Sequence, residues 1–104
     1  MTRAYLINPQ DQTIREVQLE QGLESIRSLI GQKSVDRDEI GDDGDHLYFD
    51  EACFIRATPD SKRFKLDTLP PVAGFGVVAR TLPDGAFADA SVTLESLLGR
   101  VRFS

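Results

Sequence analysis

The chain has 104 residues, of which 40% are hydrophobic and 28% are charged, and its formal net charge is −5. This length suits one domain with a single core, and the composition is that of an ordinary soluble protein. No apolar run approaches the roughly 18 residues of a membrane span, and no signal peptide is expected before the first strand-like run. The single cysteine excludes an intrachain disulfide, which makes the cytoplasm the expected location.

The charge is distributed unevenly along the chain. Residues 36–51 contain eight acidic residues and one basic residue, so this segment carries −7 and, since the total is −5, the remainder carries +2. Residues 56–65 contain four basic residues and one acidic residue. Nucleic-acid binding is not expected, because it requires a concentrated basic face. Two oppositely charged segments, together with sheet edges that need cover, predict a homodimer.

The first part of the chain predicts a β-hairpin followed by a short helix. Residues 4–7 (AYLI) form an apolar run closed by an Asn-Pro turn, and residues 13–19 (TIREVQL) are rich in β-branched side chains. In residues 23–30 the apolar side chains recur at helical spacing, and Gly31 stands where a glycine typically ends a helix. So short a helix must be held by packing against a sheet.

The middle of the chain predicts a second hairpin. Its strands are residues 35–40 and 46–49, and the loop between them consists of Asp and Gly, which tolerate the positive φ angles of a hairpin loop. A tight turn then leads into residues 53–55 (CFI), which predict another strand. Residues 57–71 contain three prolines and predict a long irregular loop.

The last part of the chain predicts a third hairpin and a second helix. Residues 74–80 and 86–90 are the two strands, joined by a Leu-Pro-Asp-Gly turn. Thr93 is suited to cap the N-terminus of the helix, and Arg100 and Arg102 near its end suit the helix macrodipole. The apolar stripe of this helix comprises Leu94, Leu97, Leu98 and Val101.

These elements predict a single α+β domain over residues 1–104. Its mostly antiparallel sheet is built from two or three hairpins, and two short helices pack on one face of the sheet. The order of the strands in the sheet does not follow from the sequence. The side chains expected to be largely buried are Leu6, Ile26, Leu29, Leu47, Phe49, Val77, Leu94 and Leu97.

The acidic stretch EIGDDGDHLYFDE, residues 39–51, allows two interpretations. Acids in a hairpin loop are ordinary turn residues whose charges water solvates. Alternatively, Asp42, Asp43 and Asp45 are candidate ligands for Ca²⁺ or Mg²⁺, which prefer carboxylate oxygens. The spacing does not fit an EF-hand, because aligning Gly44 to loop position 6 puts Gly41 at position 3, which needs an acidic ligand. We favour the turn, and we expect no cofactor.

The other chemistry-bearing residues favour structural roles. One His and one Cys do not complete a zinc site. A thiol–imidazole pair of Cys53 and His46 is conceivable, but the apolar residues after Cys53 favour a buried, inert thiol. The carboxylates cluster in a polar turn rather than against an apolar wall, which disfavours acid–base catalysis. Residues 74–76 (GFG) match only a fragment of a phosphate-binding loop and favour a bulge or close strand packing, so no catalytic or cofactor-binding residue is assigned.

Several segments together resemble a known family. They are the strand ending in Ile7-Asn8-Pro9, the Leu23-Glu24-Ser25-Ile26 helix, the Leu47-Tyr48-Phe49-Asp50-Glu51 strand and turn, and the strand from Gly74 to Ala79 with its polar hairpin. Over most of the chain they resemble the bacterial and phage family of domain of unknown function 3846. The chain departs from that family in its proline-containing loop, which lacks the family's usual Asn-Arg signal. The resemblance implies a small α+β domain often found on mobile elements, and it implies no activity and no functional residue.

The sequence favours a non-enzymatic binding or accessory protein with an unidentified protein partner. One alternative is an acidic nucleic-acid mimic that inhibits a DNA-binding protein, which the charge of residues 36–51 favours and the basic segment 56–65 disfavours. A second alternative is a small hydrolase or metal-dependent enzyme, for which the sequence offers no constellation of catalytic residues. A deep pocket with converging polar groups would favour the enzyme, and a flat acidic face spaced like DNA phosphates would favour the mimic.

Overall fold

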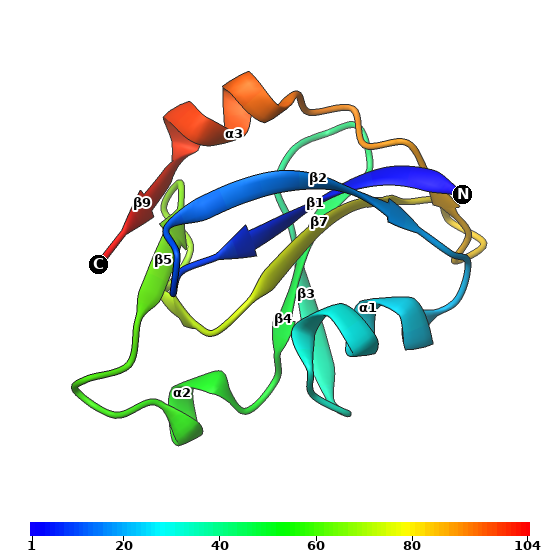
Figure 1. Ribbon diagram of the computed structural model, residues 1–104. Coiled ribbons are helices and arrows are strands. Elements are labelled where there is room, and N and C mark those ends of the chain that lie inside the picture. The colour runs from blue at the N-terminus through cyan, green and yellow to red at the C-terminus, as the bar shows by residue number, and fades with distance from the viewer.

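A computed structural model describes residues 1–104, and its main feature is a six-stranded antiparallel sheet (Figure 1). The strands follow the order β2-β1-β7-β4-β3, and β8 pairs with β7. These strands are β1 (Thr2–Asn8), β2 (Thr13–Leu19), β3 (Val35–Glu39), β4 (Asp45–Asp50), β7 (Gly76–Thr81) and β8 (Phe87–Ala88). The expected hairpins are present as β1–β2, β3–β4 and β7–β8, and β7 enters the sheet between the first two hairpins.

A second antiparallel sheet contains three short strands in the order β6-β5-β9. They are β5 (Arg63–Leu66), β6 (Val72–Ala73) and β9 (Val101–Phe103). The expectation of a loop throughout residues 57–71 is therefore wrong for β5, where buried Phe64 and Leu66 alternate with an exposed lysine as in any half-buried strand. Val101, predicted in the helical stripe, instead begins β9, because it pairs with Leu66.

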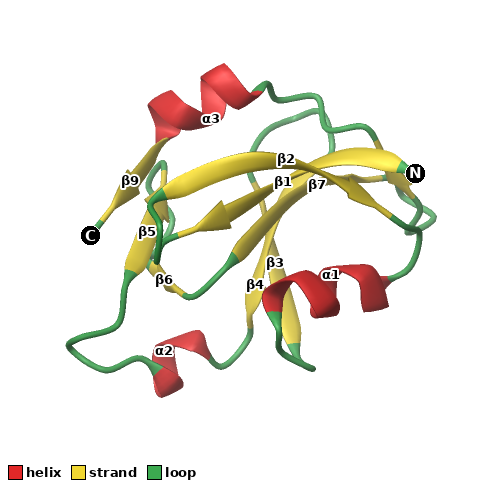
Figure 2. Ribbon diagram, in the orientation of Figure 1, coloured by secondary structure: helices red, strands yellow, loops and turns green.

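The structure contains three helices, drawn in red in Figure 2. They are α1 (Leu23–Ile30), α2 (Cys53–Arg56) and α3 (Leu94–Arg100). Gly31 ends α1 in the left-handed region with φ of 80°, and the Thr93 hydroxyl oxygen caps α3 by accepting a hydrogen bond from a backbone N–H in its first turn, as the sequence predicts. The longest of the three helices, α1, has eight residues, so none of them could span a membrane.

The helix α2 stands where the sequence predicts a strand. The carboxylate of Asp50 accepts a hydrogen bond from the backbone N–H of Ala52 at 3.0 Å and pairs with Nε of Arg56 at 3.2 Å. These two contacts close the chain into a single helical turn that begins at Cys53. The strand expectation for residues 53–55 is wrong, because the contacts of one buried carboxylate outweigh the β propensity of three residues.

Alternation along the central strands divides the core into two layers. On β4, Leu47 and Phe49 belong to the cluster beneath the small sheet and α3, whereas Tyr48 belongs to the cluster beneath α1. Ile26 of α1 and Leu97 of α3 lie in different clusters. The α+β class with antiparallel sheets is confirmed, but the two predicted helices cover opposite faces of the main sheet rather than one face.

The expected core is largely confirmed. Six of the eight side chains predicted to be buried are no more than 6% exposed. They are Leu6, Ile26, Leu47, Phe49, Val77 and Leu97. Leu29 and Leu94 are only partly buried, and each packs against the margin of one cluster.

Gly76, at the start of β7, lies where the two sheets approach each other. A β-carbon on Gly76 would stand 2.5 Å from Cζ of Phe64 and 3.0 Å from a δ-carbon of Leu47. The expectation that glycines in residues 74–76 permit close packing is therefore confirmed at Gly76.

Gly76→Ala should lower the free energy of unfolding by about 1–3 kcal/mol, because the two side chains that the new methyl group meets are fully buried. Gly99→Ala is the matched control, since a β-carbon at Gly99 meets nothing within 4 Å and alanine favours the helix by up to about 1 kcal/mol. Chemical denaturation of both variants measures the two effects. Equal stability of the two variants would contradict the close packing of the sheets at Gly76.

Candidate functional site

The acidic stretch of residues 39–51 spans the end of β3, the hairpin loop and β4. Asp42 and Asp43 lie in the loop and are exposed, as the turn interpretation predicts. Asp45 is only 5% exposed and begins β4 on the same face as Leu47. The three candidate metal ligands therefore do not form one cluster, and no group of three or more His, Cys, Asp or Glu side chains is placed to hold a metal ion.

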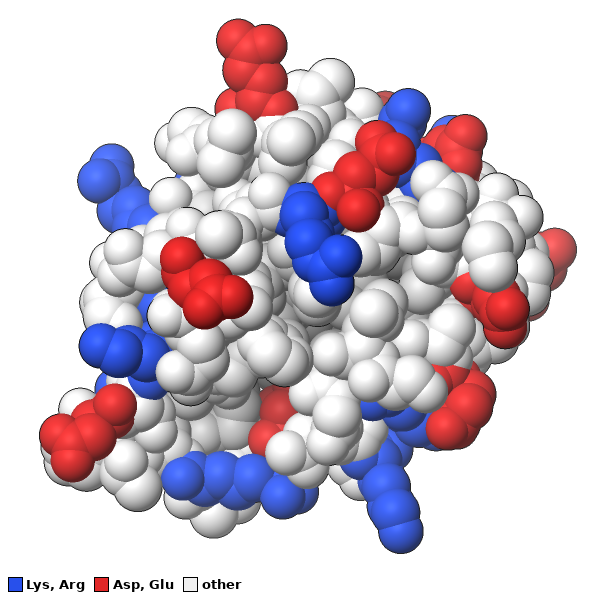
Figure 3. Space-filling view, in the orientation of Figure 1, with Lys and Arg blue, Asp and Glu red and all other residues white.

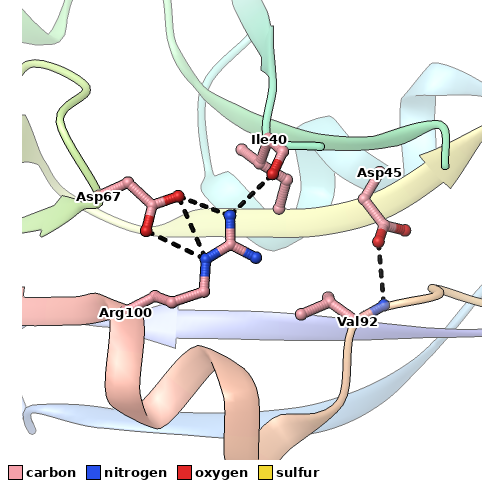
Figure 4. Close-up of polar contacts among 5 residues, drawn as sticks. All are labelled: Ile40, Asp45, Asp67, Val92 and Arg100. Atoms are coloured by element: carbon pink, nitrogen blue, oxygen red, sulfur yellow. Dashed lines mark hydrogen bonds and ion pairs between the residues drawn. The ribbon is translucent and has the colours of Figure 1, made fainter. Parts of the chain in front are cut away.

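The carboxylate of Asp45 holds the segment that leads into α3. Its Oδ1 accepts a hydrogen bond from the backbone N–H of Ser91 at 2.9 Å. Its Oδ2 accepts one from the N–H of Val92, also at 2.9 Å (Figure 4). The expectation that Asp45 is a solvated turn residue is wrong, because the alternation of β4 places it on the buried face, where it satisfies two backbone donors.

A second polar contact connects the end of α3 to two distant segments. Arg100 Nε donates to the carboxylate of Asp67 at 3.0 Å, and Nη2 donates to the carbonyl oxygen of Ile40 at 2.7 Å (Figure 4). Chiefly through this hydrogen bond, Arg100 lowers the pKa of Asp67, and Asp67 raises the pKa of Arg100. Arg100 therefore bridges the chain after β5 and the chain after β3, which goes beyond the macrodipole role that the sequence suggests.

On the other face of β4, one carbonyl group orients the only histidine. The carbonyl oxygen of Gly44 lies 2.8 Å from Nδ1 of His46 and also accepts the backbone N–H of Thr81 at 2.9 Å. A carbonyl oxygen only accepts, so the hydrogen of the neutral imidazole is on Nδ1 and the lone pair is on Nε2. Nε2 forms no hydrogen bond within the protein.

Three further polar side chains lie on the same face as His46. Arg37 Nη1 donates to the phenol oxygen of Tyr48 at 3.3 Å, and the hydroxyl oxygens of Tyr48 and Thr81 are 2.7 Å apart. Tyr48 is 3% exposed and Thr81 is 8% exposed. The two hydroxyl groups carry two hydrogens and share one hydrogen bond, so one hydroxyl hydrogen has no acceptor in the protein.

Arg37, His46 and Thr81 line a cleft of about 570 Å³ between the β3–β4 hairpin and the turn that joins β7 to β8. We call it the hairpin cleft. Its titratable side chains are Arg37, Glu39, Asp42, Asp43, His46 and Arg80. A smaller cleft of about 370 Å³, to which Tyr48 contributes, shares Arg37 and Thr81 with the hairpin cleft. The buried hydroxyl pair thus lies where the two clefts adjoin.

The two arginines of the hairpin cleft have no carboxylate partner. Arg80 Nε donates to the carbonyl oxygen of Asp43 at 2.9 Å, and Arg37 donates only to Tyr48. The ion pairs of the structure are Arg27–Glu24, Arg56–Asp50 and Arg100–Asp67. Both cleft arginines therefore keep an unpaired charge and most of their N–H donors free.

Cys53 lies outside the hairpin cleft. It is 1% exposed and belongs to the same cluster as Leu47, on the face of the main sheet opposite His46. The expected buried thiol is confirmed, and burial raises its pKa, which makes the reactive thiolate scarce at neutral pH. The conceivable Cys53–His46 pair is contradicted by these positions.

The sequence singles out His46 as the only histidine, but it does not indicate which polar side chains surround it. In the β3–β4 pairing, Arg37 stands opposite Tyr48 and Glu39 stands opposite His46. Alternation along both predicted strands would have found these neighbours once the length of the hairpin loop set the register. Thr81 lies on β7, 33 residues after Tyr48 in the chain, and no local signal in the sequence indicates the contact between the two hydroxyl groups.

No protein-family model, no curated protein and no solved structure matches the chain. The geometry of the hairpin cleft is therefore the basis for inferring a function, and the family that the sequence resembles stays a prediction.

Asp45→Asn should lower the free energy of unfolding by about 1–3 kcal/mol, because the amide keeps one acceptor oxygen for two backbone N–H groups. Asp42→Asn and Asp43→Asn are matched controls in the exposed loop, and each should change the stability by less than about 0.5 kcal/mol. Urea denaturation of the three variants measures the difference. If all three had the stability of the parent, Asp45 would not hold the segment before α3.

Asp67→Asn should reduce the loss of stability in acid. Arg100 lowers the folded-state pKa of Asp67, so the ion pair contributes fully above the ordinary aspartate pKa of about 4, and the contribution is lost as the pH falls through the lower folded-state pKa. The carboxylate is 39% exposed, so the contribution at neutral pH should be below about 1 kcal/mol. Asparagine tolerates the φ of 52° at this position.

Free energies of unfolding of parent and Asp67→Asn, measured from neutral pH into acid, test this dependence. The two proteins should differ above the ordinary aspartate pKa and converge below it. Asp60→Asn, an exposed position in the preceding loop, should follow the parent throughout. A difference between parent and Asp67→Asn that stayed constant across this range would contradict a contribution from the charge of Asp67.

Proposed function

We propose that this chain is a non-enzymatic binding protein that recognises a charged ligand in the hairpin cleft. One observation carries the proposal: the lining of the cleft contains two arginines without carboxylate partners and a histidine held in one tautomer, and a buried hydroxyl pair with an unused hydrogen lies where the cleft adjoins its smaller neighbour. These groups come from the three neighbouring strands β7, β4 and β3. A concave site with a few oriented polar groups is the usual form of a ligand site.

The hydrogen bonds of these groups favour binding over catalysis. A nucleophile needs a base within hydrogen-bond reach, and that base is commonly oriented by a third group. Here the Thr81 hydroxyl bonds to Tyr48 rather than to His46, and the Nδ1 of His46 bonds to a neutral carbonyl rather than to a carboxylate. The hydroxyl pair and His46 can therefore donate and accept hydrogen bonds to a bound ligand.

An acidic nucleic-acid mimic is less well supported. Asp45 and Asp50 are buried and engaged with backbone N–H groups, which removes them from the acidic surface. On the face drawn in Figure 3, acidic and basic side chains are interspersed. A mimic would need a continuous acidic face, so we do not adopt this function.

The exposed end of α2 supports contact with another protein. Phe54 is 55% exposed and Ile55 is 88% exposed at adjacent positions. Neighbouring large apolar side chains at the surface are typical of protein contacts. This surface follows the end of β4 that lies away from the hairpin loop (Figure 1), so a partner or a second copy can dock there while the cleft is filled.

Titration of the isotope-labelled protein with phosphate, acetate, methylammonium and Mg²⁺ tests the proposal. At least one probe should shift the backbone NMR signals of Gly44, His46 and Thr81 saturably at concentrations up to about 20 mM, since so small a ligand binds weakly. The signals of Phe54 and Ile55 should stay in place, and the probe should be recovered unchanged. Absence of a localised, saturable shift with all four probes would contradict a binding site in the cleft, and conversion of a probe would contradict a non-enzymatic protein.

A further inference from the structure

The Tyr48–Thr81 hydroxyl pair requires an acceptor that the protein does not supply. Whichever oxygen donates to the other, one hydroxyl hydrogen remains unused, and both side chains are more than nine-tenths buried. Arg37 is a donor only, so its contact with Tyr48 does not supply the acceptor. An oxygen atom of a ligand at the junction of the two clefts would accept this hydrogen.

The cleft arginines require acceptors as well. Each guanidinium group carries five N–H donors, and the protein occupies one in Arg37 and one in Arg80. The planar arrangement of the remaining donors matches two oxygens of a carboxylate or a phosphate group. Arg37 stands opposite Tyr48 and shares its face, whereas Arg80 stands opposite Asp45 and leaves β7 on the other face of the sheet. Arg37 is therefore the arginine that can share a ligand with the hydroxyl pair, and it keeps its charge at any physiological pH.

His46 complements either protonation state of such a ligand. With Nδ1–H held by the Gly44 carbonyl, the neutral ring presents an acceptor at Nε2, which suits a phosphate oxygen that carries a hydrogen. The protonated ring presents a donor at the same atom, which suits an unprotonated oxygen. The ring keeps its orientation in both states, because Nδ1 carries a hydrogen in both.

The carboxylates of Glu39, Asp42 and Asp43 line the same cleft and oppose an anion. All three residues are exposed, so water and salt screen their charges more than those of buried groups. The same carboxylates would attract a cation, which is therefore the alternative ligand to test. Removing one carboxylate should therefore strengthen the binding of an anion and weaken the binding of a cation.

From these donors we infer that the ligand of the hairpin cleft is a small oxyanion, a carboxylate or phosphate group, held by Arg37 and the hydroxyl pair of Tyr48 and Thr81. The inference rests on the proposed binding function of the cleft and names the chemical class of its ligand. The carboxylates of Glu39, Asp42 and Asp43 lower the affinity for a lone anion, so weak binding is expected.

NMR titrations with phosphate and with acetate at constant ionic strength test the inference. The dissociation constant of at least one of them should rise roughly tenfold in Arg37→Gln, which removes charge-assisted hydrogen bonds. Arg102→Gln, an exposed position on β9 outside the cleft, makes the same change of charge and should alter the constant less than about twofold. Asp42→Asn should lower the constant. Dispersed amide spectra verify that each variant is folded.

The outcomes of these titrations distinguish the inference from the proposed binding function. Binding of phosphate alone, of acetate alone or of both supports the inference and identifies the oxyanion. If Arg102→Gln weakened oxyanion binding as much as Arg37→Gln does, the effect would come from net charge alone, and the inference would be overturned. Saturable binding of methylammonium or Mg²⁺ in the cleft, lost in Asp42→Asn and without any binding of an oxyanion, would overturn the inference and leave the proposed binding function intact. Binding of no probe would overturn both.

Discussion

The carbonyl oxygen of Gly44 accepts hydrogen bonds from two sides, and both the fold around the hairpin and the cleft depend on its direction. One bond attaches the β3–β4 loop to β7 through the N–H of Thr81, and the other orients His46. The φ of 93° at Gly44 gives the carbonyl this direction, and this angle favours glycine. A β-carbon at this position would also come within 3.3 Å of the carbonyl oxygen of Thr81.

The strand that follows this turn, β4, presents different side chains on its two faces. Asp45, Leu47 and Phe49 face the small sheet and α3, where the carboxylate of Asp45 satisfies two backbone N–H groups and the other two side chains pack in the core. His46 and Tyr48 face the opposite side and line the two clefts. A single alternation therefore separates the groups that hold the fold from the groups that are available to a ligand. Asp45 holds the segment before α3, and Arg100 at the end of α3 holds the carbonyl oxygen of Ile40, so polar contacts fix the helix at both ends (Figure 4).

The sequence predicts the elements whose signals are local. The hairpins follow from short apolar runs and turn residues, and the ends of α1 and α3 follow from Gly31 and Thr93. The small sheet was missed because its pairs join distant segments, such as Leu66 with Val101. The helix α2 was missed because it depends on the contacts of one buried carboxylate, which periodicity does not reveal.

The candidate site was only partly predictable. His46 attracted notice as the only histidine in an acidic stretch, whereas the metal interpretation treated Asp45 as equivalent to its exposed neighbours. Alternation extended back from Phe49 through Leu47 would have placed Asp45 on the buried face. The hydroxyl pair requires the position of β7 beside β4, which is a long-range pairing that follows from no local pattern.

The orientation of His46 tests the preorganised cleft most directly. Long-range proton–nitrogen NMR of the imidazole, recorded above the pH at which the ring is protonated, reports which nitrogen carries the hydrogen. We predict the hydrogen on Nδ1, where the Gly44 carbonyl accepts it, and a lone pair on Nε2. A ring with its hydrogen on Nε2, or a mixture of the two tautomers, would contradict a preorganised cleft, because the carbonyl of Gly44 would then not hold the histidine.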